Sequence, residues 1–206
     1  MAKSSFDKLY AVADLIKEKS TQTNRAASTA INKTATFAIK ETIEAMMGEV
    51  TLEESYIKKH LRTVARASPA NLRAVIQANE RETNLTRYKY SQSKAGVSVA
   101  VNRGQFRTIK KAFYVTNLRN SGTSGIALRN RDAVEYFTRA LRKGYGATAK
   151  KRAKLARIRQ KAANKPNGIE VLKSRSINQL MLSVREDIQP QIRQFLIDEF
   201  VKDFFK

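Results

Sequence analysis

Apolar residues recur at helical spacing along the N-terminal quarter of the chain, over residues 5–47. A first stripe contains Phe6, Leu9, Tyr10, Ala13 and Ile16. A second, alanine-rich stripe contains Ala27, Ala30, Ile31, Ala35 and Ala38, and Gly48 is typical of a helix end. The pattern predicts a long helix whose small side chains let another element approach closely. Two interpretations stay open for the second stripe: core packing within the chain, or a contact between subunits.

The middle of the chain changes to the alternating pattern of strands. Thr51 and Glu54 match a capping box, which predicts a short helix ending near Leu61. The strands expected after it are residues 63–67, 72–78, 96–104, 112–115 and 125–128. Polar and Gly-containing or Pro-containing turns separate several of them, so we expect a small antiparallel sheet.

Helical spacing returns from Asp132 onward, and Asn167-Gly168 marks a turn before a short strand at 169–172. A C-terminal helix is expected from Ile177, and Pro190 should kink or restart it. Its last turns carry the aromatic residues Phe195, Phe200, Phe204 and Phe205. These aromatic side chains are candidate subunit contacts, with core packing as the equal alternative.

These elements predict an α+β fold with a small antiparallel sheet packed by long N- and C-terminal helices and a basic helical insertion. We expect one domain over residues 1–206. Its expected parts are N-terminal helices (5–61), a sheet core (62–130), a basic helical excursion (131–165), and a short strand with the C-terminal helix (169–206).

Charge adds the strongest functional signal, because 40 Lys and Arg residues against 18 Asp and Glu give a net charge of +22. Between Arg139 and Arg175 the only acidic residue is Glu170. A helix through this stretch has only Leu155, Ile158 and Ala162 as an apolar strip, so we expect it to project from the body or to be disordered alone. The candidate contacts with phosphate or with an acidic partner are Lys150, Lys151, Arg152, Lys154, Arg157, Arg159 and Lys161. A solvated helix face is the alternative.

The remaining composition argues against catalysis. The chain has no cysteine and a single histidine, His60, so we expect no metal site, no cofactor and no thiol or histidine-based active site. Glu170 lacks the neighbouring acids of a metal-dependent nuclease, and no motif for sequence-specific nucleic-acid recognition is present. The N-terminal residues lack the apolar stretch of a signal peptide, and no run is long enough to span a bilayer.

The order of several segments resembles the minor tail protein Z, or tail completion, family of long-tailed, lambda-like bacteriophages. The segments are residues 29–35, 57–62, 67–74, 96–104 and 111–113. The similarity runs over roughly residues 25–130 and returns around 174–177 and in the C-terminal helix. The basic segment 131–165 is longer than the family's usual connection, so its role is not carried over.

The resemblance implies a structural virion protein that acts in tail completion, located in the tail or neck and in the host cytoplasm during assembly. It implies a homo-oligomeric ring around the DNA path, expected as a hexamer, in contact with tail tube or terminator and neck proteins. Nonspecific contact with genomic DNA is compatible with this role, and no membrane is involved. The alternative is a free nucleic-acid-binding protein without sequence specificity.

Overall fold

The computed structural model of the chain describes residues 5–118, 122–142 and 148–205, with side chains from Lys17 onward. Its contacts divide the chain into two compact units. Unit 1 contains residues 1–48, 54–80 and 177–206, and unit 2 contains residues 49–53 and 81–176. Each unit is described by itself, and the single domain expected over 1–206 stays a prediction. Helices and small antiparallel sheets confirm the α+β class.

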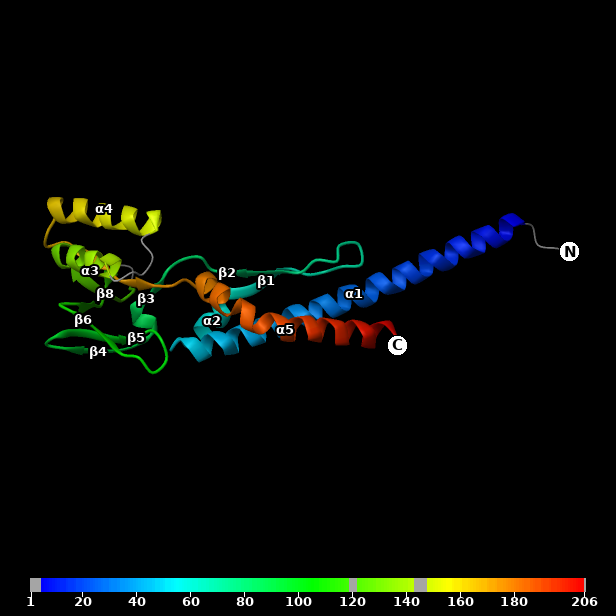
Figure 1. Cartoon of the computed structure of the whole chain (residues 1–206), viewed down its shortest axis with the longest axis horizontal. Coiled ribbons are helices and arrows are strands. Elements are labelled where there is room, and N and C mark those ends of the chain that lie inside the picture. The colour runs from blue at the N-terminus through cyan, green and yellow to red at the C-terminus, as the bar shows by residue number, and fades with distance from the viewer. Residues whose placement is uncertain (1–4, 119–121, 143–147, 206) are drawn as a thin grey trace. The chain divides into compact units, whose positions relative to one another are not determined.

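Unit 1 is built on two long helices (Figure 1). Helix α1 (Ser5–Glu49) confirms the long N-terminal helix, and α5 (Ile177–Phe204) confirms the C-terminal one. The helices run antiparallel, with Phe37 of α1 stacked on Phe195 of α5 at 4.2 Å between ring centroids. The stripe from Phe6 to Ile16 lies on α1, but its side chains are outside the described ones.

The chain continues through Pro190 without leaving helix α5, so the expected restart at this residue is wrong. Three apolar residues of the turns before it, Leu180, Val184 and Ile188, are buried. Packing of this face holds the first half of α5 in place. The helix therefore tolerates the loss of the backbone hydrogen bond that proline, which has no amide hydrogen, cannot donate.

A short helix and a hairpin complete unit 1. Helix α2 (Glu54–His60) leads into β1 (Leu61–Ala65), which pairs antiparallel with β2 (Val75–Ala78) as the alternation predicts. Beyond β1, the side-chain amide of Asn32 on α1 donates to the Ala67 carbonyl at 2.9 Å, and its oxygen accepts from the Ala67 amide at 2.8 Å. This paired contact fastens the hairpin to α1.

The predicted capping box is wrong. Helix α2 begins at Glu54, and the Thr51 hydroxyl donates to the carbonyl of Ala100 rather than capping a helix. The Thr51 amide also donates to the Val101 carbonyl, at 3.2 Å. Residues 49–53 therefore belong to unit 2, where a tertiary contact outcompetes the local cap.

Unit 2 contains three small sheets, with strand orders β4-β5-β6, β7-β8-β9 and β10-β3. Together with the β1-β2 hairpin of unit 1, the described residues form four small sheets, whereas the sequence predicted a single sheet. The strands are β3 (Thr83–Asn84), β4 (Lys89–Ser93), β5 (Gly96–Ala100), β6 (Arg107–Lys110), β7 (Phe113–Val115), β8 (Gly125–Arg129), β9 (Ile169–Val171) and β10 (Lys173–Ser174). A 3-10 turn, η1 (Leu85–Arg87), and two helices, α3 (Asn130–Arg142) and α4 (Ala149–Asn164), complete the unit. The expected hairpin of 112–115 and 125–128 is confirmed by β7 and β8. Part of its tip, residues 119–121, lies outside the described residues, as does Lys143 of the basic stretch.

The central strand β5 depends on glycine at its start. Gly96 has φ +141°, and a Cβ added there would lie 2.2 Å from the carbonyl oxygen of Ile109 in β6. Only glycine permits this close pairing, so residue 96 sets where β5 meets β6. Val97 and Val99 then fill the interior of the unit.

Helix α4 packs against α3 within unit 2 and does not project from it, contrary to the sequence prediction (Figure 1). Its narrow apolar strip is sufficient for this contact: Leu155 is 7% exposed and Ile158 is fully buried. The strip turns the basic residues of α4 toward the edges and outer face of the helix.

Candidate nucleic-acid interface

The positive charge of the chain is concentrated in one half of it. Unit 2 contains 24 Lys and Arg against 6 Asp and Glu, whereas unit 1 contains 16 against 12. The net charges are therefore +18 and +4 for two units of nearly equal length. A polyanion is the class of partner that such a unit attracts.

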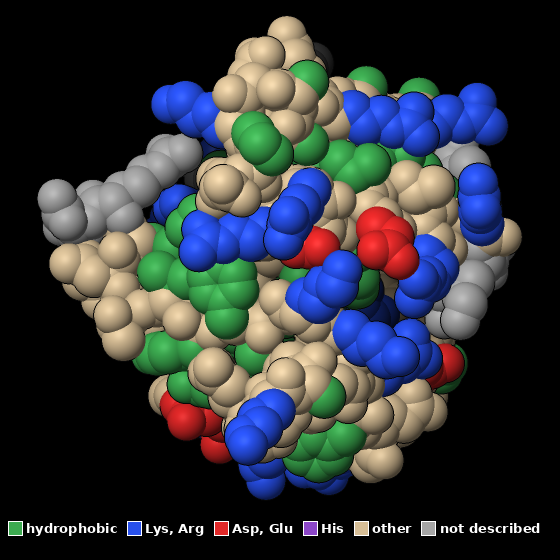
Figure 2. Space-filling view, turned by 90° about the vertical axis from the view of Figure 1, so that its left-hand side faces the viewer, with side chains coloured by type: hydrophobic (Ala, Val, Ile, Leu, Met, Phe, Trp, Pro, Cys, Tyr) green, Lys and Arg blue, Asp and Glu red, His purple; other side chains and the backbone are tan. Residues whose placement is uncertain are grey.

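Figure 2 shows Lys and Arg side chains distributed over the face it presents, interleaved with hydrophobic side chains and with few acidic ones. An interleaving of cations with apolar and aromatic surface is typical of proteins that bind both the phosphates and the bases of a nucleic acid.

Helix α4 carries all seven basic residues that the sequence singles out, and it contains no acidic residue. The helix begins after Thr148, whose hydroxyl accepts from the Lys151 amide at 3.4 Å as an N-cap. Lysines close to this N-terminus oppose the helix dipole, so the cap and the packing on α3 must stabilise the helix.

Three of the seven residues form ion pairs within unit 2. The buried carboxylate of Glu170 on β9 accepts from Lys161 Nζ at 2.6 Å and from Arg157 Nη2 at 3.4 Å. Lys154 Nζ lies 3.4 Å from Glu82 and 5.2 Å from the centre of the Phe137 ring. These residues stabilise the position of α4, and their charge is partly compensated there.

Lys150, Arg152 and Arg159 are exposed, and no ion pair with them exists among the described residues. Lys151 is also exposed. Arg152 and Arg159 are seven residues apart and therefore share one face of the helix. The predicted set thus divides into an inner group (Lys154, Arg157 and Lys161) and an outer group (Lys150, Lys151, Arg152 and Arg159).

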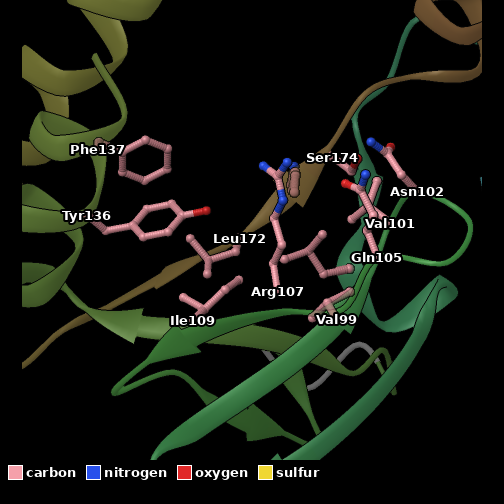
Figure 3. Close-up of a pocket in the computed structure, with 12 residues that line it drawn as sticks. Val99, Val101, Asn102, Gln105, Arg107, Ile109, Tyr136, Phe137, Leu172 and Ser174 are labelled. Atoms are coloured by element: carbon pink, nitrogen blue, oxygen red, sulfur yellow. The ribbon is translucent and has the colours of Figure 1, made fainter. Parts of the chain in front are cut away.

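A pocket of about 270 Å³ lies in the same unit (Figure 3). Its walls include Val99 and Ile109 from the β4-β5-β6 sheet, Tyr136 from α3, and Leu172 before β10. Arg107 of β6 rises into the pocket, and the Tyr136 hydroxyl points toward the guanidinium. Burial raises the pKa of Tyr136 above its usual value, and the nearby charge of Arg107 opposes that rise.

Sequence reasoning missed this pocket because its residues come from distant segments. Arg107, Tyr136 and Lys173 line it from β6, α3 and β10, and each is unremarkable alone. The adjacent aromatic pair at 136 and 137 within a basic region is the one signal that could have indicated it.

The candidate subunit contacts lie in unit 1. Ala30, Ala35 and Ala38 are buried, and Ala27 and Ile31 are half-buried. Of the aromatic residues, Phe195 stacks on Phe37, while Phe200, Phe204 and Phe205 form a run of ring contacts at the end of α5.

Many of the candidate subunit-contact residues therefore take part in the packing of α1 inside unit 1. Phe205, in contrast, is 80% exposed. Ile197 and Val201, spaced four residues apart before it, are 55% and 47% exposed.

In the part of the chain that the structure describes, no three His, Cys, Asp or Glu side chains gather where they could hold a metal ion. No helix there is long and apolar enough to cross a membrane. Comparison of the chain with protein-family descriptions, with curated proteins and with solved structures found no match.

Proposed function

We propose that this chain is a non-enzymatic structural protein that binds nucleic acid through unit 2 and associates with other protein through unit 1. The observation that carries the proposal is the division of charge, +18 in unit 2 against +4 in unit 1. A protein that only needed solubility would gain nothing from placing its cations in one half.

The state of the basic residues supports nucleic acid as the partner. The inner group on α4 stabilises the fold through Glu170 and Glu82, while the outer group remains exposed to solvent. Each cation placed on a phosphate releases condensed counterions, so the outer group can supply affinity that does not depend on base sequence.

The tail-completion role rests on the resemblance of residues 25–130 to the tail completion family. In that role the protein is a virion component of the tail or neck, forming a homo-oligomeric ring, expected as a hexamer, around the DNA path. Unit 1 offers the subunit surface, with the exposed apolar residues Ile197 and Val201 on α5 and Phe205 directly after it. Tail tube or terminator and neck proteins are the neighbours that this role requires.

A free nucleic-acid-binding protein without sequence specificity is the second candidate, because the same +18 unit favours it. It differs in what unit 1 does: a free binder needs no lasting association between copies.

The contacts of Glu170 and His60, the side chains that could act in catalysis, support a proposal without an enzymatic step. Glu170 is engaged by two cations, and His60 Nδ1 donates to the Tyr56 carbonyl at 2.8 Å.

Light scattering of the purified chain tests the proposal, at low and high salt and with and without duplex DNA. A discrete ring-sized oligomer that persists at high salt and binds duplex at low salt supports the virion role. A monomer that assembles only on DNA, and dissociates from it as salt rises, supports the free binder. A chain that binds no duplex at low salt contradicts both.

A further inference from the structure

We infer that the pocket of unit 2 is a binding site for a single unpaired nucleobase, with Arg107 and Lys173 placed for the adjoining phosphates. This inference deepens the proposed nucleic-acid binding and rests on it. The inference adds that the chain binds a strand that carries bases more tightly than a strand that has the same phosphates and no bases.

The chemistry of the walls matches an aromatic heterocycle. Val99, Ile109 and Leu172 supply apolar surface, and the Tyr136 ring stands at the side of the pocket, 39% exposed (Figure 3). An exposed aromatic ring over an apolar floor is a stacking platform, and stacking accepts any base because every base has a π-face.

The size of the pocket limits the ligand. About 270 Å³ falls just below the range of roughly 300–1,000 Å³ that holds drug-sized ligands and cofactors. One base with part of its sugar is therefore a better fit than a dinucleotide cofactor. A base inside a duplex cannot enter, so the ligand is a single strand, a frayed end or a flipped base.

The polar groups of the pocket are placed for a nucleotide rather than for a neutral aromatic molecule. The Arg107 guanidinium stands inside the pocket, and Lys173 also lines it. Asn102 and Gln105 carry amides that both donate and accept, which suits the edge of a base. No Asp or Glu lines the pocket.

One residue of the pocket contacts the basic helix. Phe137 lines the pocket, meets the Tyr136 ring edge-on with centroids 5.2 Å apart, and carries Lys154 of α4 over its ring.

The test compares a short oligothymidylate with an abasic strand of the same length, which has the same phosphates and no bases. We expect the chain to bind oligothymidylate more tightly by about 5-fold to 150-fold, the range that one stacked base contributes. Tyr136→Ala should remove this preference and leave the affinity for the abasic strand unchanged. Tyr136→Phe keeps the ring and should keep the preference.

Tyr90→Ala is the matched control, because Tyr90 on β4 is 40% exposed, against 39% for Tyr136, and is not among the residues that line the pocket. It should leave both affinities unchanged. If Tyr136→Ala fails to fold, photo-crosslinking of the unmodified chain to a strand containing 5-iodouracil replaces it, and the crosslink should map to Tyr136 or Phe137.

Equal affinity of the chain for the two strands, or a crosslink confined to unit 1, would overturn the base pocket. Salt-sensitive binding of both strands with equal affinity would still support the proposed function. Binding of neither strand at low salt would remove the proposed function and the pocket together.

Discussion

Helices α4 and α5 show how differently the two units use charge. Helix α4, in unit 2, has seven basic residues and no acidic one, whereas α5, in unit 1, has three basic and five acidic residues. Two of the five acids of α5 form ion pairs within unit 1: Lys33 of α1 donates to Glu199 at 2.7 Å and to Asp203 at 2.8 Å. Among the described residues, no ion pair exists with Lys150, Arg152 or Arg159 of α4, which is the state expected of groups that bind an external anion.

The comparison also separates what stabilises each unit. Unit 1 packs two long helices and a hairpin, and its charges nearly balance. Unit 2 must hold a net charge of +18 together by the packing of small sheets and of α3 on α4. Because the cations of unit 2 repel one another, its stability should depend more on salt concentration than the stability of unit 1 does.

The largest effect is expected from truncating one core residue in each unit. Ile57 in unit 1 and Ile126 in unit 2 are both fully buried, and truncating either to alanine should cost about 2–5 kcal/mol. Hydrogen exchange should show that Ile57→Ala lowers protection in unit 1 and that Ile126→Ala lowers it in unit 2. Equal loss in both units from either variant would show that the chain unfolds as one cooperative domain.

The next effect concerns the outer face of α4. Replacing Lys150, Arg152 and Arg159 with glutamine should reduce the slope of log affinity against log salt for duplex DNA by about 3, at about 0.9 per phosphate contact. The measurement is a salt titration of fluorescence anisotropy.

The control for that titration replaces Arg62, Arg66 and Arg73, which are exposed on the hairpin region of unit 1, with glutamine. The net charge changes by the same amount in both triple variants. A similar loss of slope in the control would mean that net charge alone drives binding and that unit 2 has no special part in it.

Replacing Glu170 should have a smaller effect, which lowers the stability of unit 2 and raises its affinity for DNA. Its carboxylate engages Arg157 and Lys161, so Glu170→Gln should destabilise unit 2 by about 1 kcal/mol, since both cations are largely exposed. The same change releases two cations and should tighten DNA binding. Thermal unfolding and anisotropy together check it.

Glu82→Gln is the comparison variant, because it removes the same charge from a more exposed carboxylate, which lies 3.4 Å from Lys154. We expect it to change stability less than Glu170→Gln. Weaker DNA binding by Glu170→Gln would contradict the assignment of Arg157 and Lys161 as cations held by Glu170.

The smallest effect is a pH dependence in unit 1. Hydrogen bonds with Asp203 and Glu199 raise the pKa of Lys33 above 10.5, and the hydrogen bond from Lys33 lowers the pKa of Glu199 below 4.5. A lowered carboxyl pKa stabilises the fold above pH 4.5 and loses that effect as the pH falls through the folded value. A raised lysine pKa stabilises the fold below pH 10.5 and loses it as the pH rises further.

Lys33→Met should therefore lower the unfolding temperature between pH 4.5 and pH 10.5, with the difference from the unmodified chain shrinking outside that window. Lys40→Met serves as control, because Lys40 and Glu44 form an exposed pair at 3.7 Å. A pH-independent effect of Lys33→Met would show that the side chain acts through packing and not through its charge.

The sequence by itself determined the elements whose signal is local. The periodic stripes specified α1 and α5, and the alternation around Val97 and Val99 specified β5 as a buried strand. The seven basic residues of α4 were also visible at once, because charge is a property of composition and not of folding.

Only the tertiary structure decided which elements share a core. Thr51 matched a local cap and instead bonds to Ala100, and Pro190 matched a kink or restart and lies inside a helix α5 that does not restart there. In both cases contacts from distant residues outweighed a local preference of about 1–3 kcal/mol. The same reason explains the pocket and the division of charge. Arg107 and Tyr136 become neighbours, and the outer cations of α4 become distinct from the inner ones, only when distant strands and helices meet.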